Sequence, residues 1–451
     1  MKIAIIGSGI AGLTAAYRIH RDRIGEVTLL DGQPRAGIDA HRVEINHQGH
    51  QVTVDVPSRM FNDAQWPNLT RLYDEIGVRY VPVNASQSFS VIEERKHDGE
   101  PYSYLRNDDA TRPGQMTSQM LSRTGRRIRL QAMKFFRVGT SDLHAGSDHP
   151  SSQQTLGDYL RRHDFSDDFV YRFLYPTLAS TVCTCQYASL DSYPAHTVLR
   201  TLSNLVRPGK LQRTRLGTAD VARRLLRGKI RVLHNTRVDS VAVQVNERDN
   251  ASSARSDSCE SDGVEVRLDD GRRLLFDHVV LATQADTALS LLENPDARQR
   301  AILGSIRYDN VSVCVHDDPR LMPKRKSHWS TFNMLTEPSH QAASCTVWLN
   351  RFYGNWKFRH PVFQTIGDVG TIDPAKVVRS TKLCRSVVNF QSLAALDQLD
   401  QWHAEPGRRI WFCGSWASRG VPLLESAVVS AEKVSESIKA GIDRLSRVQS
   451  N

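Results

Sequence analysis

The first residues of the chain contain three glycines at the spacing of a phosphate-binding turn. Gly7, Gly9 and Gly12 form the pattern G-x-G-x-x-G. In this pattern the first glycine makes a tight turn, the second lets the backbone approach a pyrophosphate, and the third lets a helix pack closely against a sheet. The N–H groups at the start of that helix, at Ile10 and Ala11, would face the phosphate charge. These residues predict a dinucleotide site, with a simple glycine-rich turn as the alternative.

The elements on either side of the glycines support the dinucleotide interpretation. Lys2–Ile6 is an apolar, Ile-rich run that predicts a buried strand, and residues 13–20 continue with helical spacing. Glu26–Leu30 predicts a second strand, and it ends in Asp31, 19 residues after Gly12. A carboxylate at that position can accept hydrogen bonds from the ribose of the adenosine half. The pattern alone leaves both FAD and NAD(P) open as the ligand.

Length and composition limit the class of protein. The chain has 451 residues, of which 40% are hydrophobic and 24% charged, as expected for a globular protein of two or three domains. We find no secretory signal pattern and no apolar run near the length of a membrane span, so we expect a cytoplasmic protein. Seven cysteines form no C-x-x-C pair, which suits a reducing compartment and predicts no metal site.

The positive charge of the chain is dispersed except in one segment. The net charge is +10, but no nucleic-acid-binding motif accompanies it, so we expect no nucleic-acid partner. A solvated helix face is the default interpretation of the basic segment, and docking to a membrane surface or to an acyl carrier is the sharper one. Its residues are the basic Arg123, Arg126, Arg127, Arg129, Lys134 and Arg137 and the apolar Ile128, Leu130, Met133, Phe135 and Phe136.

The remaining sequence alternates between strand-like and helix-like segments. Residues 105–205 are mostly helical in pattern, and residues 424–441 predict a closing helix. Residues 248–262 are rich in Ser and Asp and are expected to be a disordered hairpin tip. Strands are predicted at 42–56 (as a hairpin), 78–83, 89–93, 229–245, 264–269, 274–283, 311–315, 344–349 and 409–413.

Several separated motifs resemble the FAD-dependent amine oxidase and phytoene desaturase superfamily. They are the N-terminal glycine pattern, the strand ending in Leu281-Ala282-Thr283, and a C-terminal stretch containing Gly414-Ser415-Trp416 and Glu425-Ser426-Ala427. Val54-Asp55-Val56 and Tyr193-Pro194-Ala195-His196 make the chain look like a subgroup of predicted FAD/NAD-binding oxidoreductases associated with fatty-acid modification.

The resemblance implies an α/β fold. It consists of a Rossmann-like FAD-binding domain of the glutathione-reductase type and an inserted α+β substrate domain. Residues 1–80, 211–300 and 401–445 would form the FAD-binding domain. Residues 81–210, largely helical, and residues 301–400, forming a sheet, would build the substrate domain.

The resemblance also implies a noncovalent FAD and assigns residues to it. Gly7, Gly9, Ile10, Ala11 and Gly12 would meet the diphosphate, and Asp31 with the adjacent Gly32 the adenosine ribose. The other implied residues are Arg35 and Gly37 in a second diphosphate loop, Val238 at the adenine, Ala282 and Thr283 after the mid-chain strand, and Gly414, Glu425, Ser426 and Ala427 beside the flavin ring.

Three of the positions that depart from the family pattern replace glycines. Ile38 replaces the second glycine of a Gly-Gly pair, and Ser426 and Ala431 replace glycines of the C-terminal motif. These changes add bulk near the expected cofactor. They indicate either a reshaped flavin pocket or weaker FAD binding.

Hydride transfer to a flavin needs a dry, apolar pocket and few acid or base groups. Candidates to line such a pocket are Arg59, Trp66, Tyr175, Cys183, Trp329, Asn333, Trp348 and Trp416. Arg59 could anchor a carboxylate or form a surface ion pair. Trp416 could face the flavin or belong to the core, and Tyr175 is more often a core residue. His196 and His41 are acid–base candidates, although a lone histidine is usually structural.

The leading functional hypothesis is an FAD-dependent oxidoreductase acting on C–C bonds. Its substrate would be a hydrophobic unsaturated acyl or polyketide-like molecule, as in secondary metabolism, and the reaction would be desaturation or double-bond isomerisation. A flavin amine oxidase or an NAD(P)H-dependent reductase is one alternative, and a non-catalytic flavin-fold binding protein is another. The oligomeric state stays open.

Overall fold

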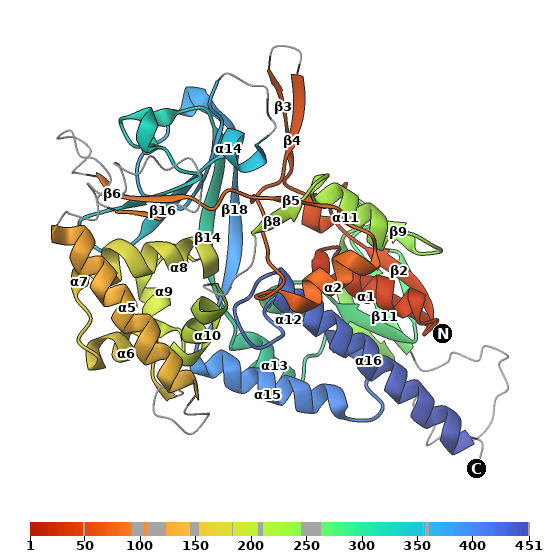
Figure 1. The fold of residues 1–451 in the computed structure, drawn as a ribbon. Helices are drawn as coiled ribbons and strands as arrows, with labels where there is room; N and C mark the ends of the chain where they lie inside the picture. The colour runs from red at the N-terminus through yellow and green to blue at the C-terminus, as the bar shows by residue number, and fades with distance from the viewer. Residues whose placement is uncertain are drawn as a thin grey trace, which may run out of the picture.

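The computed structural model of the chain has two lobes, each built on its own main sheet (Figure 1). It describes residues 1–47, 50–92, 103–105, 123–144, 153–182, 184–205, 211–244, 263–354, 356 and 360–449. Both termini lie on the lobe with the parallel sheet (Figure 1). No helix in these ranges is long and apolar enough to cross a membrane.

The first lobe contains a five-stranded parallel sheet in the order β19-β13-β1-β2-β9. Its strands are β1 (Lys2–Ile6), β2 (Glu26–Leu30), β9 (Arg231–Leu233), β13 (His278–Leu281) and β19 (Ile410–Phe412). The predicted strands at both ends and near residue 280 are thus confirmed.

Both faces of this sheet are covered, as the continuous apolar runs of its strands require. Ile3 and Ile5 pack with helices α1 (Ile10–Arg21), α2 (Pro67–Glu75), α11 (Gly217–Leu225) and α16 (Leu424–Gln449). Ala4 and Ile6 point to the other face, where α12 (Ala285–Leu291), α13 (Ala297–Gly304), α15 (Phe390–Ala404) and a three-stranded antiparallel sheet cover them. The antiparallel strands are β10 (Val238–Gln244), β11 (Gly263–Leu268) and β12 (Arg273–Phe276).

The second lobe is a seven-stranded sheet in the order β18-β14-β17-β16-β15-β6-β7, packed against a helical layer. Its strands are β6 (Gln87–Val91), β7 (Ser103–Leu105), β14 (Arg307–His316), β15 (Phe332–Thr336), β16 (Ala343–Trp348), β17 (Phe363–Ile366) and β18 (Val377–Val387). The helices are α5 (Arg123–His144), α6 (Leu156–Arg162), α7 (Asp167–Phe169), the π-helix η3 (Val170–Leu174), α8 (Tyr175–Val182), α9 (Tyr187–Ser192), α10 (Ala195–Leu205) and α14 (Leu349–Tyr353).

Short elements complete the chain. The predicted hairpin at 42–56 forms as β3 (Val43–His47) and β4 (His50–Val54), and β5 (Tyr80–Pro82) pairs with β8 (Gln212–Thr214). Single 3₁₀ turns occur at η1 (Gly37–Asp39), η4 (Pro319–Leu321), η5 (Lys326–His328) and η6 (Pro374–Lys376).

The strand predicted at 274–283 differs in detail from the structure, whereas the hairpin predicted around residues 248–262 is confirmed. The single strand expected at 274–283 is divided into β12 and β13 at Asp277. The chain changes sheets there, because Asp277 N donates to Lys2 O at 2.9 Å while Lys2 N donates to the Asp277 carboxylate at 2.6 Å. The hairpin expected around residues 248–262 is present as the antiparallel pair β10 and β11, with Gln244 opposite Gly263. The proposed disordered tip lies outside the described residues.

The five expected domain segments stay a prediction, but two elements pack differently from that division. The hairpin β3–β4, within 1–80, contributes Val43 and Val54 to the core of the seven-stranded sheet. Helix α15, mostly within 301–400, contributes Leu399 and Trp402 to the core of the parallel sheet. Burial of an apolar face, rather than position in the chain, decides which lobe receives each element.

Candidate active site

The N-terminal glycines form a turn with open space in front of it. Gly7 has a φ of +99° and donates from its N to Leu30 O at 2.8 Å. A Cβ on Gly12 would lie 1.9 Å from Gly7 O, so the helix can approach the strand only with glycine there. A Cβ on Gly9 would meet nothing within 4 Å. The turn therefore has the room that a phosphate group would need.

Asp31 connects this turn to the second predicted phosphate loop through Ser8. Ser8 N donates to the Asp31 carboxylate at 2.7 Å, and the Ser8 hydroxyl donates to the same oxygen. Gly37 N donates to Ser8 Oγ at 2.7 Å. The other Asp31 oxygen accepts from Gln33 N at 2.8 Å. The two loops are therefore held together by the chain itself.

The other residues expected along the adenosine half have different environments. Gly32 and Arg35 are exposed beside Asp31, and Val238 is the buried first residue of β10. Ile38, the departure from the Gly-Gly pair, is buried in the core shared by α1 and α11. Its bulk is absorbed by that core. Contact of these residues with a cofactor stays a prediction.

The ends of β13 and β19 meet at Trp416. The Trp416 indole N–H donates to Thr283 O at 3.0 Å, and its side chain is buried. Gly414 N donates to Ser430 Oγ at 3.0 Å, which fixes the segment after β19 against α16. The Ser426 hydroxyl donates to Val421 O at 2.7 Å and so holds the loop before α16. Ala431 is fully buried in the core.

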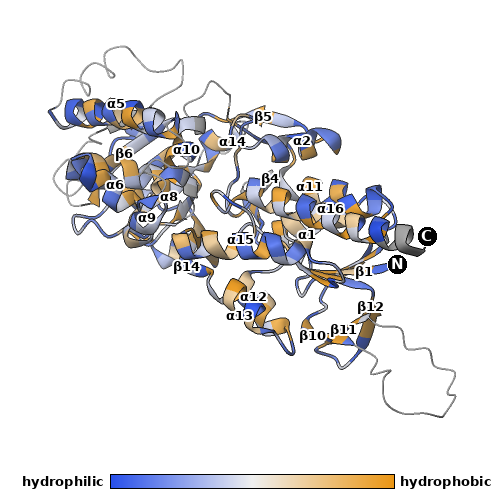
Figure 2. Cartoon of the chain, turned by 90° about the horizontal axis from the view of Figure 1, so that it is seen from below, coloured by the Kyte–Doolittle hydropathy of each residue, from blue (hydrophilic) through white to orange (hydrophobic). Residues whose placement is uncertain are grey.

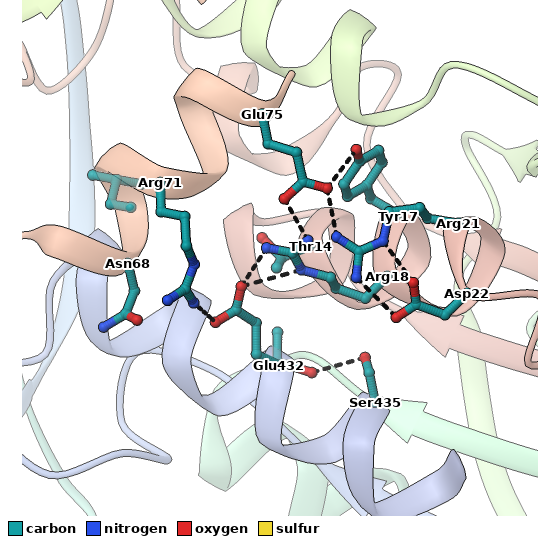
Figure 3. A network of polar contacts seen from close by, with 12 residues as sticks. Thr14, Tyr17, Arg18, Arg21, Asp22, Asn68, Arg71, Glu75, Glu432 and Ser435 are labelled. Atoms are coloured by element: carbon teal, nitrogen blue, oxygen red, sulfur yellow. Dashed lines mark hydrogen bonds and ion pairs between the residues drawn. The ribbon is translucent and has the colours of Figure 1, made fainter. Parts of the chain in front are cut away.

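Helix α16 is fixed at its start by a carboxylate and along its length by ion pairs. Glu425 accepts from Asn68 N at 3.1 Å and from Leu69 N at 2.8 Å, so its side chain caps α2. Arg18 on α1 pairs with Glu432 on α16 and with Glu75 on α2 (Figure 3). These contacts hold the N-terminal part of α16 against α1 and α2.

A cavity of about 410 Å³ joins these elements to the second lobe. On one side it is lined by Gly9, Ile10, Ala11, Ala282, Thr283, Gly414, Trp416, Leu424 and Ala427. Trp66, Leu69 and Leu211 also line it. On the side of the seven-stranded sheet it is lined by Val311, Val313, Phe332, Cys345, Val347 and Ile366. The wall is therefore mainly apolar, and burial raises the pKa of the Cys345 thiol to about 12, which keeps it uncharged.

Two arginines are the charged exception in this wall. Arg59 and Arg385 both line the cavity. Burial lowers the pKa of Arg59, the nearby Asp55 raises it and the charge of Arg385 lowers it further. His41 is half-buried nearby, and burial together with Arg379, Arg59 and Arg385 lowers its pKa. A neutral His41 is thus favoured near this positive region.

The other predicted catalytic and lining residues do not reach the cavity. Tyr175 is buried in the helical layer and donates its hydroxyl to Asp191. His196 is half-buried at the start of α10. Asn333 is bonded to Ser330, and Trp329 and Trp348 pack around Phe363. Cys183 lies outside the described residues.

The cavity also contains residues that the sequence did not predict. Tyr308 lines it and accepts Ala285 N at 2.7 Å, and Ala179, Ser180 and Thr181 contribute one turn of α8. Arg385 comes from the end of β18. The sequence contained only an indirect sign of these residues, the β-branched run at 311–315 that predicts a strand next to Tyr308. That run does not show which other segments lie beside it.

Comparisons with known proteins agree with this architecture. A model of the NAD(P)-binding Rossmann-like domain matches residues 5–76. No curated protein matches the sequence. A CLA-producing fatty acid isomerase from P. acnes matches the structure with a TM-score of 0.63 and 15% identity, covering 96% of this chain and 98% of that one.

Two further solved structures cover nearly the whole chain. One is a proposed protoporphyrinogen oxidase from Exiguobacterium sp. 255-15, with TM-score 0.62 and 17% identity over 98% of this chain and 99% of that one. The other is a putrescine oxidase bound to putrescine, with TM-score 0.62 and 13% identity over the same shares of each chain. This chain has the fold of FAD-dependent amine oxidase-type enzymes. The fold class predicted from the sequence is therefore confirmed.

Proposed function

We propose that the protein is an FAD-dependent oxidoreductase acting on C–C bonds of a lipophilic substrate. The open turn at Gly9, the paired loops at Ser8 and the start of α16 at the cavity fit the diphosphate and ring of FAD. When bound, the flavin supplies a two-electron acceptor and donor. Gly9, Gly37 and Asp31 would hold its adenosine diphosphate half, and Trp416, Gly414 and Ala427 its ring.

The single observation that carries the proposal is the composition of the cavity wall. Among the described residues that line it there is no Asp, Glu, His or Lys. Apolar side chains would exclude water and orient a hydrocarbon chain, and hydride removal or return requires no resident base. Double-bond isomerisation by removal and return of the same hydride is proton-neutral and fits this wall directly. Desaturation also releases a proton, which would have to leave to solvent because the lining supplies no carboxylate or imidazole.

Amine oxidation is the weaker alternative for the same reason. A cationic amine entering the cavity would meet Arg59 and Arg385 and no lining carboxylate. Like charges brought into a low-dielectric cavity repel strongly. An NAD(P)H-dependent reductase and a non-catalytic flavin-fold binding protein are further alternatives.

Purification in the presence of FAD tests the proposal directly. We expect a yellow protein whose flavin spectrum bleaches with dithionite and whose released cofactor is FAD by HPLC. Turnover of unsaturated acyl substrates, without peroxide release from amines, would separate C–C chemistry from amine oxidation. A colourless protein unable to take up FAD would contradict the proposal.

We also propose that α5 is a contact surface for a membrane or an acyl carrier. The experiment given in the Discussion tests binding to a membrane that contains anionic lipid. Leu130 and Met133 have exposed fractions of 66% and 61%. They lie on one line along the helix with the exposed Arg126 and Arg137. Hydrophobic and hydrophilic residues alternate along α5 in Figure 2.

A further inference from the structure

One terminal nitrogen of Arg59 is buried and has no hydrogen-bond partner. Nη1 of Arg59 makes no contact of this kind with the part of the chain that the structure describes. Arg59 as a whole is partly buried, and it belongs to the cavity lining. Leaving a charged donor buried without a partner is costly. This nitrogen therefore points to an acceptor that the folded chain does not supply.

The nearest carboxylate is already committed to another element. Asp55 raises the pKa of Arg59 through its charge, but its carboxylate is hydrogen-bonded to another element. The Asp55 carboxylate instead accepts from Thr218 N at 3.0 Å and Thr218 Oγ1 at 2.8 Å. It thus caps the start of α11.

A second cation increases the positive charge at the same place. Arg385 comes from β18, lines the same cavity and acts electrostatically on both Arg59 and His41. Two arginines facing one apolar space repel each other unless an anion lies between them. A planar carboxylate can accept paired N–H bonds from such guanidinium groups.

We infer that Arg59 and Arg385 form the binding site for a carboxylate on the substrate, whose hydrocarbon chain occupies the apolar part of the cavity. This inference rests on the proposed function and narrows its substrate class to amphiphilic acids. The acid group would lie at the arginines, and the chain would extend along Val313, Phe332 and Val347. The charged end would then set which carbon atoms lie next to the flavin.

The experiment compares oleate with its uncharged methyl ester on the FAD-loaded protein. Binding is followed by the change in the flavin absorption spectrum, and FAD affinity is measured separately by titrating the apoprotein. Two variants, Arg59→Met and Arg385→Met, keep most of the side-chain volume but remove the charge. A third, Arg59→Lys, keeps the positive charge but loses the paired N–H donors of the guanidinium. Arg379→Met is the matched control, because Arg379 is an exposed arginine of the same strand that does not line the cavity.

We expect the unaltered protein to bind oleate more tightly than the ester. Arg59→Met and Arg385→Met should each weaken oleate binding about 10- to 100-fold, the range for a lost charge-assisted hydrogen bond. Ester binding and FAD affinity should change little in these variants, and oleate binding should change little in the Arg379→Met control. The oleate affinity of Arg59→Lys should lie between those of the unaltered protein and Arg59→Met.

Other results would overturn the inference. Equal binding of oleate and ester by the unaltered protein, or binding of neither, would show that the arginines do not select a carboxylate. Equal loss of both ligands together with FAD affinity in Arg59→Met would assign Arg59 to the cofactor instead. Failure of the unaltered protein to take up FAD is a separate result, which would contradict the proposed function itself.

Discussion

At the scale of single residues, Gly9 and Gly12 separate the binding role of the glycine turn from its packing role. A side chain at Gly9 enters open space, whereas one at Gly12 collides with Gly7 O. We expect Gly9→Asp to fold normally but to purify without flavin, because its carboxylate would repel the diphosphate. Gly9→Ala should weaken FAD binding less than Gly9→Asp does, because its methyl group enters the phosphate space without adding a negative charge. Flavin absorbance and thermal unfolding of each variant are the measurements.

Gly12→Ala provides the contrast. Because its Cβ would have to displace backbone, we expect a less stable protein, by about 2 kcal/mol or more, as for other overpacked sites. A Gly9→Asp protein that retained FAD, or a Gly12→Ala protein as stable as the parent, would contradict this division of roles.

The buried His403 should make the folded protein less stable as the pH falls. Burial, aided by Lys433 and Arg408, lowers its pKa from 6.5 to about 3, and its Nε2 accepts Phe412 N at 3.2 Å. At neutral pH the ring is uncharged in both folded and unfolded chains. As pH falls below 6.5 the unfolded chain takes up a proton that the folded one cannot, so the free energy of unfolding falls by about 1.4 kcal/mol per pH unit.

The test is urea unfolding of the parent and of His403→Gln between about pH 7 and about pH 5. We expect the variant to be less stable at neutral pH, because it loses ring packing against Trp402 and Phe412. The slope of its free energy of unfolding against pH should be smaller, because unfolding of the variant takes up about one proton fewer in acid. His316, whose pKa burial lowers to about 4, remains in both proteins. Identical slopes would exclude His403 as a source of the acid sensitivity.

Individual site residues were predictable where local chemistry alone determines them. The glycine turn and Asp31 have fixed spacing along one strand, one helix and the next strand, and the structure brings them together through Ser8. Their contact with a cofactor stays a prediction. Tyr175 and His196 could not be excluded from sequence, because their distance from the cavity depends on how the helical layer packs. Arg385 could not be found, because nothing local distinguishes it from Arg379 on the same strand.

At the scale of elements, amphipathic pattern decided which segments could be recognised. The strands of the parallel sheet are apolar on both faces and were found. The missed strand β18 has charged and polar residues along most of its length, because it is an edge strand whose outer half is exposed. Its partner β14 reads as a strand only at its buried end.

Helix α5 carries the prediction for the membrane contact. The full-length protein should co-sediment with vesicles containing anionic lipid, and this binding should weaken at higher salt. Leu130→Ser with Met133→Ser should reduce the binding several-fold without affecting FAD, because both side chains are already exposed. Leu216→Ser is the control, since Leu216 has an exposed fraction of 63% but lies before α11. Equal binding by all three proteins would exclude this surface.

At the scale of the whole molecule, the cavity exists only where the two lobes meet. Gly9 and Trp416 come from the parallel-sheet lobe, and Val313 and Phe332 come from the seven-stranded sheet. A sequence motif describes one continuous stretch, as the match over residues 5–76 does. The site as a whole combines residues from segments far apart in the chain. This is why the glycine turn could be recognised from one stretch, whereas the residues that the seven-stranded sheet contributes to the cavity could not.

The order of strands in the parallel sheet also has a consequence for synthesis on the ribosome. Strand β1 is flanked by β2, made directly after it, and by β13, whose residues pair with it from about 275 positions later. The last member, β19, is made only near residue 410. Until then the nascent chain has open sheet edges, and contacts this distant in sequence form slowly. We therefore expect the parallel sheet to be completed only late in synthesis, once β19 has emerged and can pair with β13.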